Sequence, residues 1–199
     1  MKRRWLLVGS VLSVAGCSVL PQQEYRQRRD WSLAPSRGSV VKPRANAKSL
    51  LVRTVSAAPG LEARGVQWLL KDGSVNTDYW EQWIVPPALS VEESLRRWLS
   101  DSGVFAAVVA PGSRAVTDLV LEAELTALIA DPNKGTAKAS LSIVVLEPKG
   151  DKTKVWLQKT ETAEVPLSGS AATEIVAALR DAVAKLLAVV ETDMAIVAR

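Results

Sequence analysis

The chain has 199 residues, of which 25 are basic and 21 acidic, with one cysteine and no histidine. This length suits one domain behind a short leader. Without an imidazole there is no Ser-His-Asp or Cys-His site, and one cysteine allows neither an internal disulfide nor an ordinary zinc site, so we expect no enzyme activity, metal or cofactor.

Residues 1–16 are predicted to be a secretion signal. Lys2, Arg3 and Arg4 form a positive start, and an apolar run follows from Trp5 to Val14. That run is too short for a membrane-spanning helix, which needs roughly 20 apolar residues. Loss of the leader leaves 22 basic against 21 acidic residues, so the high isoelectric point of 9.3 does not predict nucleic-acid binding.

The run Val14-Ala15-Gly16-Cys17 resembles the lipobox of bacterial lipoproteins. The resemblance implies cleavage between Gly16 and Cys17, a diacylglyceryl group on the Cys17 thiol, and acylation of the new amino group by a fatty acid such as palmitate. Several acyl chains on one residue give stable anchoring. Ser18 follows, where inner-membrane lipoproteins commonly have aspartate, so the resemblance favours the periplasmic face of the outer membrane. The alternative is a plain signal peptide with an incidental cysteine.

Residues 17–30 are predicted to be the lipidated cysteine and a flexible tether. The thirteen residues from Ser18 to Asp30 are polar and lack apolar periodicity, and fully extended they reach about 45 Å. Two interpretations of Arg26, Arg28 and Arg29 stay open: contact with anionic lipid head groups, or a solvated linker.

Four strands and a helix are expected in the first half of the folded part. The Lys71-Asp72-Gly73 turn favours a hairpin, and Leu95, Trp98 and Leu99 recur at helical spacing. Ser90 and Glu93 have capping-box spacing, and Glu92-Glu93 would suit a helix start. The expected strands are 31–33, 49–55, 66–70 and 74–79, and the helix follows Pro86-Pro87 and ends at Gly103.

The second half repeats this order, with expected strands 104–109, 118–129, 136–146 and 154–165 and a closing helix 171–197. Alternation places Leu119, Leu121, Ala123, Leu125, Ala127 and Ile129 on one face. The prediction is an α+β fold: one domain, residues 31–199, with two helices packed on an antiparallel sheet in the order ββββ-α-ββββ-α.

The order and spacing of these features resemble the ABC-type transport auxiliary lipoprotein family, which includes the paraquat-inducible lipoprotein C type. The resemblance covers about residues 31–197. Trp31 and Trp68 stand where the family commonly has tyrosine. The residues that carry the resemblance are Pro59-Gly60-Leu61, Arg64 to Trp68, Tyr79, Trp83, Pro86-Pro87, Leu95, Leu99, Gly103 and Phe105.

The resemblance implies a non-catalytic periplasmic accessory of a transport system. Its partners would be an MCE-type periplasmic protein and the ABC permease and ATPase of the inner membrane, and the cargo would be lipid or another hydrophobic molecule. Two alternatives stay open: a carrier that holds lipid between sheet and helices, and a lipoprotein that assists outer-membrane assembly. A homo-oligomer is also left open.

The tryptophans supply the candidate contacts. Trp98 is expected in the core and Trp83 in packing, whereas one of Tyr79 and Trp80 should point outward. Exposed tryptophan is a common binding hot spot, so Trp80, Trp156 and Tyr79 are the candidate partner interface. Glu122 and Glu124 lie about 7 Å apart on one strand face, a spacing that an inverting glycosidase could use, but a solvated strand face is the simpler interpretation.

Overall fold

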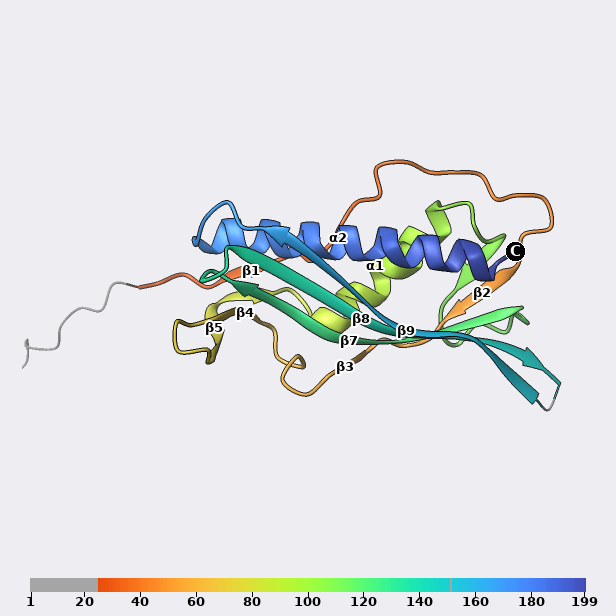
Figure 1. The fold of residues 1–199 in the computed structure, drawn as a ribbon, viewed down its shortest axis with the longest axis horizontal. Helices are drawn as coiled ribbons and strands as arrows, with labels where there is room; N and C mark the ends of the chain where they lie inside the picture. The colour runs from red at the N-terminus through yellow and green to blue at the C-terminus, as the bar shows by residue number, and fades with distance from the viewer. Residues whose placement is uncertain (1–24, 151) are drawn as a thin grey trace, which may run out of the picture.

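The computed structural model describes residues 25–150 and 152–199. The predicted signal, its cleavage site, Cys17 and the first part of the tether lie outside these residues. In this described part of the chain, two helices pack on a nine-stranded sheet, which confirms the α+β class (Figure 1). The elements are β1 (Arg29–Trp31), β2 (Ser49–Val52), β3 (Ser56–Ala57), β4 (Gly65–Leu69), β5 (Val75–Trp83), α1 (Pro87–Asp101), β6 (Ala107–Val109), β7 (Leu119–Asp131), β8 (Thr136–Lys149), β9 (Lys152–Pro166) and α2 (Ala172–Val197).

The antiparallel ladder β7-β8-β9 is the longest part of the sheet. Each strand has alternating side chains, so one face can be buried along its whole length. The predicted core face of β8 is confirmed, because Ala139, Leu141, Ile143 and Val145 are fully buried. This face supplies the apolar surface on which the helices pack.

The sheet is mixed, so the expectation of a wholly antiparallel sheet is wrong. β2, β3 and β4 pair in succession with the second edge of β7, all in parallel. The chain passes through α1 before it enters β7. Such a crossover brings the chain back to the end of the sheet at which the earlier strands begin, so β7 can run parallel to them. β6 and β5 flank β2 and β4, and β1 flanks β5. The described chain has five strands before α1 rather than four, because the expected strand 49–55 ends at Val52 as β2 and a further short strand, β3, follows it at Ser56–Ala57.

A β-bulge changes which face of β7 is buried. Leu125 pairs with Leu141, but Ala127 pairs with Ser140, so Thr126 is an extra residue. An extra residue reverses the alternation beyond it. Leu128 and Ala130 are therefore buried, whereas Ala127 and Ile129, which the alternation placed on the core face, are only half-buried.

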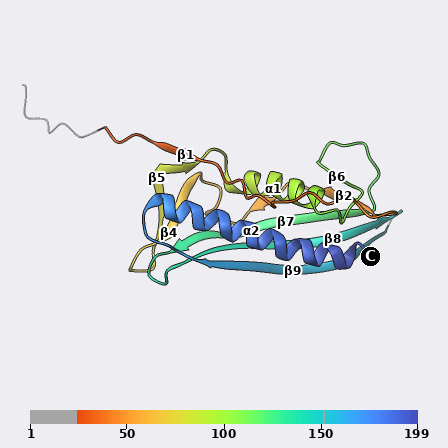
Figure 2. The same ribbon diagram turned by 90° about the horizontal axis from the view of Figure 1, so that it is seen from above.

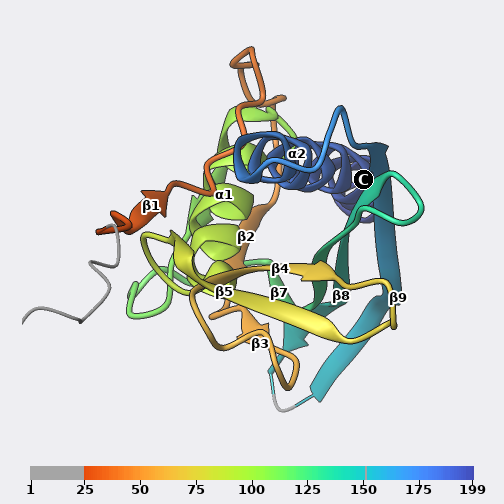
Figure 3. The same ribbon diagram turned by 90° about the vertical axis from the view of Figure 1, so that its left-hand side faces the viewer.

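The helices lie together on one face of the sheet. α2 runs along β8 and β9, and α1 lies beside it (Figures 2 and 3). Leu95, Trp98 and Leu99 of α1 are buried as predicted. The capping role expected of Ser90 and Glu93 is wrong, because the helix begins after Pro86 and has no side-chain cap. Pro87 has a backbone angle that already suits the first turn of a helix, so this helix starts without a side-chain cap.

The two ends of the molecule differ. β8 and β9 continue past the C-terminus as a protruding hairpin, whereas β1 and the N-terminal segment leave from the other end (Figure 1). Arg29 and Asp30, which were expected in the tether, belong to β1 and pair with Glu81 and Gln82 of β5. The fixed part of the chain therefore begins earlier than the sequence suggested.

Candidate functional site

The first candidate surface is centred on an irregularity in β5. Gly65 pairs with Gln82, but Gln67 already pairs with Thr77, so β5 bulges between these pairs. Asp78 stabilises the bulge, because its Oδ1 accepts the backbone N–H groups of Trp80 (2.5 Å) and Glu81 (3.0 Å). Bulges commonly re-aim side chains at functional sites.

Glu81 holds the N-terminal arm, residues 25–31, against the sheet. Its side chain is only 2% exposed, and its carboxylate accepts hydrogen bonds from Arg29 Nε (3.0 Å) and Nη2 (2.5 Å) and from Trp31 Nε1 (2.8 Å). Arg26 lies 3.7 Å from the same carboxylate. A buried carboxylate needs such donors, so this Glu81 cluster (Glu81, Arg26, Arg29 and Trp31) fixes the arm in place.

Tyr79 and Trp80, two of the three predicted interface residues, lie beside this cluster. Their rings are edge-to-face, with centroids 5.0 Å apart. Arg28 lies 4.9 Å from the Tyr79 ring centroid and Arg26 lies 5.9 Å from that of Trp80, both within cation–π range. Tyr79 remains 64% exposed and Trp80 is half-buried, so the arm itself occupies part of this surface.

Trp156, the third predicted interface residue, lies far from the other two on the β8–β9 hairpin. The register shifts here, with Leu157 opposite Val145 and Val155 opposite Leu146, so Trp156 is a bulge residue. Its Nε1 donates to Glu147 (2.8 Å), and the ammonium groups of Lys154 and Lys48 lie 3.5 and 5.7 Å from its ring centroid. The ring is 43% exposed and fixed in orientation.

Trp83 and Trp98 have the packing roles that the sequence predicted, because they are 1% and 7% exposed. Trp98 also has a polar contact that the sequence did not reveal. Its Nε1 donates to Glu191 of α2 (2.7 Å).

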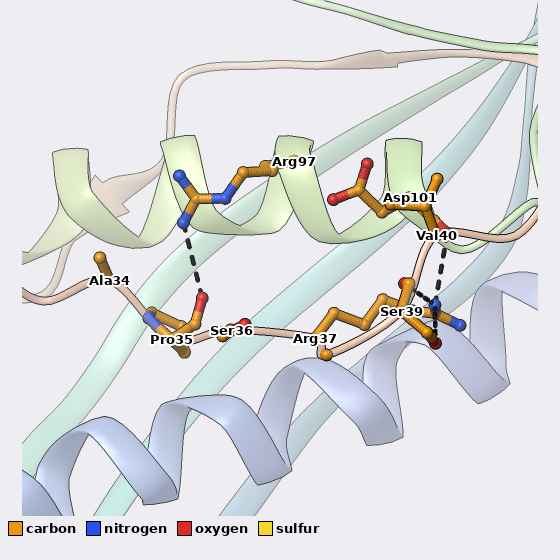
Figure 4. A pocket seen from close by; sticks show the side chains of 9 residues that line it. Ala34, Pro35, Ser36, Arg37, Ser39, Val40, Arg97 and Asp101 are labelled. Atoms are coloured by element: carbon orange, nitrogen blue, oxygen red, sulfur yellow. Dashed lines mark hydrogen bonds between the residues drawn. The ribbon is translucent and has the colours of Figure 1, made fainter.

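A strap, residues 34–41, runs between the two helices (Figure 4). The same Glu191 fastens it to α2. Arg37 Nε and Nη2 donate to the two Glu191 oxygens (2.9 and 2.8 Å), and Val41 N–H donates to the Asp101 carbonyl. The Arg37 hydrogen bonds lower the pKa of Glu191, against the effect of burial, with a further contribution from Trp98. Sequence reasoning gave this segment as a plain loop and missed Glu191, because no local pattern links residues so far apart in the chain.

The remaining candidates have little sign of chemistry. Glu122 forms an ion pair with Arg53 (2.6 Å) on an exposed surface, as a solvated strand face would. Within residues 25–150 and 152–199, no group of three or more His, Cys, Asp or Glu side chains could hold a metal ion.

Three surface pockets are each lined partly by loop residues. One of about 440 Å³ lies between the strap and α1 (Figure 4), one of about 270 Å³ lies between the end of the strap and the C-terminus, and one of about 360 Å³ lies over β4, β5 and β7. No helix residue lines the last of these, so it does not match a carrier cavity between sheet and helices. Among the described helices, none is long and apolar enough to cross a membrane.

Comparison with known proteins places these features in context. The profile of the family described as ABC-type transport auxiliary lipoprotein component matches residues 31–191. The fold is similar to that of a Xanthomonas campestris protein of the DUF330 family (22% identity, TM-score 0.69, 83% of this chain and 95% of that one). It is also similar to that of an uncharacterized protein (15% identity, TM-score 0.67, 84% of this chain and 99% of that one). A third similar structure is that of a hypothetical protein of Chlamydia trachomatis (13% identity, TM-score 0.50, 74% of this chain and 98% of that one). None of the curated proteins matches this chain.

Proposed function

Because the chain belongs to the ABC-type transport auxiliary lipoprotein family, we propose that it is a non-catalytic docking component anchored at the outer membrane. Acylated Cys17 holds it on the periplasmic face. From there it positions an MCE-type periplasmic protein of an ABC transport system that moves lipid or another hydrophobic cargo. Its contribution is placement of a partner rather than bond making.

The observation that carries this proposal is the fixed N-terminal arm. Nine residue steps separate Cys17 from Arg26, the first residue of the Glu81 cluster, so at most about 30 Å of chain lies between anchor and domain. This is shorter than the thirteen-residue tether expected from sequence. A domain held by a short leash and a buried ion-pair cluster has a restricted position and orientation, as a docking component requires.

Of the three proposed partner contacts, Trp156 is the best placed. It lies on β9 of the β8–β9 hairpin, its indole N–H is held by Glu147, and the ammonium groups of Lys48 and Lys154 lie beside its ring. A rigid, half-exposed indole with charged neighbours has the composition of an interface hot spot. Tyr79 and Trp80 are secondary contacts, because the arm covers part of them.

The test is purification of the acylated protein from membranes with identification of co-purifying chains. We expect an intact mass that carries acyl groups on Cys17, and an MCE-type protein in the eluate. Trp156→Ala should reduce the recovered partner about tenfold or more, the effect of losing a hot spot of about 1.4–2 kcal/mol. The matched control is Val116→Ala, which removes a side chain that is 97% exposed in a loop. An unmodified Cys17 thiol, or co-purification of lipid without any transport protein, would contradict the proposal.

A further inference from the structure

An exposed apolar patch lies where β5 turns into α1. It consists of Ile84, Val85 and Leu89, whose exposed fractions are 55%, 39% and 49%. These three residues lie within six positions of one another, around the Pro86-Pro87 turn that starts the helix. Exposure of neighbouring aliphatic side chains to water is unfavourable in free energy. Such patches commonly mark contacts with proteins or membranes.

The patch adjoins the N-terminal arm. The Ile84 N–H donates to the Trp31 carbonyl oxygen (2.9 Å), directly after the last paired residues of β1 and β5. Viewed along the strands, β1 and α1 lie on one flank and β9 lies on the opposite one (Figure 3). The patch and the described part of the arm are therefore on the same flank, and β9 is on the opposite one.

The arm adds groups that suit a bilayer surface. Tyr25 is 89% exposed, Arg26 follows it directly, and Arg28 lies two residues further on. Tyrosine and arginine favour the interfacial region of a bilayer, where the ring is partly buried and the guanidinium meets phosphate. Arg28 stacks on the exposed Tyr79 ring, which places a further aromatic group beside this basic segment.

We propose that this flank is a membrane-contact surface: Ile84, Val85 and Leu89 enter the interface of an anionic bilayer while the arm arginines meet its phosphates. The proposal rests on the proposed anchoring through Cys17. The occupant follows from chain length, because the leash of about 30 Å between Cys17 and Arg26 keeps the adjoining patch near the bilayer surface. The contact turns the β8–β9 hairpin away from the membrane, toward a partner in the periplasm.

The lone cysteine makes a direct test practical. Once acylated, Cys17 has no free thiol, so a single introduced cysteine is the only site for a thiol-reactive, polarity-sensitive dye. Leu89→Cys and Ile84→Cys report on the patch. Val116→Cys and Ile196→Cys are the controls, because these side chains are 97% and 65% exposed outside the patch and its arm. Each acylated protein is reconstituted into vesicles of phosphatidylcholine with phosphatidylglycerol.

We expect a blue-shifted dye at positions 84 and 89, with quenching by spin-labelled lipid at least about fivefold stronger than at 116 and 196. Leu89→Asp should abolish the shift at position 84, and Ile196→Asp should not. Water-like emission at all four positions on an acylated chain overturns the membrane contact but leaves the anchor intact. A dye that is shielded at 89 only after a protein partner is added assigns the patch to that protein instead. An intact mass without acyl groups overturns the anchor and the contact together.

Discussion

Replacement of Glu81 by glutamine tests how the arm is held. Glutamine keeps the size of the side chain and can still accept the Trp31 N–H, but the ion pairs with Arg29 and Arg26 are lost. Glu81 is 2% exposed, whereas the Arg29 side chain is 49% exposed and well solvated. A charge-assisted hydrogen bond contributes about 1.5–3 kcal/mol, and solvent screening of Arg29 reduces this to about 1–2 kcal/mol.

This loss should act on the arm rather than on the core. A change of about 1.4 kcal/mol shifts a local opening equilibrium tenfold, so the amide hydrogens paired between β1 and β5 should exchange with solvent about tenfold faster. Amides of α2, which packs on β8 and β9, should not change. Hydrogen exchange by mass spectrometry resolves the two regions, and trypsin cleavage after Arg29 should accelerate in parallel.

The matched control is Glu122→Gln, which breaks an ion pair with Arg53 in which both side chains are more than a third exposed. Exposed pairs contribute about 0–1 kcal/mol, so neither the arm nor the core should respond measurably. Unchanged exchange at β1 in Glu81→Gln would refute the role of this carboxylate, and equal acceleration throughout the chain would show that the cluster supports the whole fold instead.

Two further predictions concern the strap and Gly103, which lies against the end of the strap at Val41. Arg37→Ala should lower the free energy of unfolding by about 1–2 kcal/mol near neutral pH. Because Arg37 lowers the pKa of Glu191, this contribution is present above the usual glutamate range and disappears as pH falls through the folded-state pKa. Urea unfolding of the two proteins should therefore converge in acid, and a constant difference would contradict the linkage. Gly103→Ala should cost about 1–3 kcal/mol, because Gly103 has φ +71° and a Cβ would lie 2.8 Å from the Lys42 carbonyl oxygen. Gly112→Ala, also at positive φ but with no atom within 4 Å, should cost less in the same assay.

The regular elements were predictable because their signals are local. The alternation of β8 and the helical spacing of Leu95, Trp98 and Leu99 follow directly from the periods of strand and helix. The parallel pairing of β2, β3 and β4 with β7 was not predictable, because alternation shows that a strand exists but not which neighbour it takes. The Thr126 bulge was hidden for a related reason: an extra residue appears only when the partner strand is known.

Of the candidate site, the sequence indicated which aromatic side chains reach the surface, but not their partners within the fold. Tyr79 and Trp156 are exposed and Trp80 is half-buried, and their role in binding another protein stays a prediction. Glu81 and Glu191 gave no signal, although they are the residues that fix the arm and the strap. Each binds arginine and an indole N–H from segments distant in sequence, and a single sequence contains no record of such a pairing.

Glu81 and Glu191 hold segments whose attachment has a different energetic basis from the folding of the core. The β7-β8-β9 ladder and α2 share an interior that is almost entirely apolar, so burial of apolar surface is its main source of stability. In the described chain from residue 25 to β2, β1 is the one regular element. Ion pairs at Glu81 and Glu191, together with the buried side chain of Leu33, fasten this stretch to that interior. Release of the arm is therefore separable from unfolding. In the proposed anchored protein, the orientation of the domain at the membrane would depend on the contacts of Arg26 and Arg29 with Glu81, which ionic strength weakens while the core stays folded.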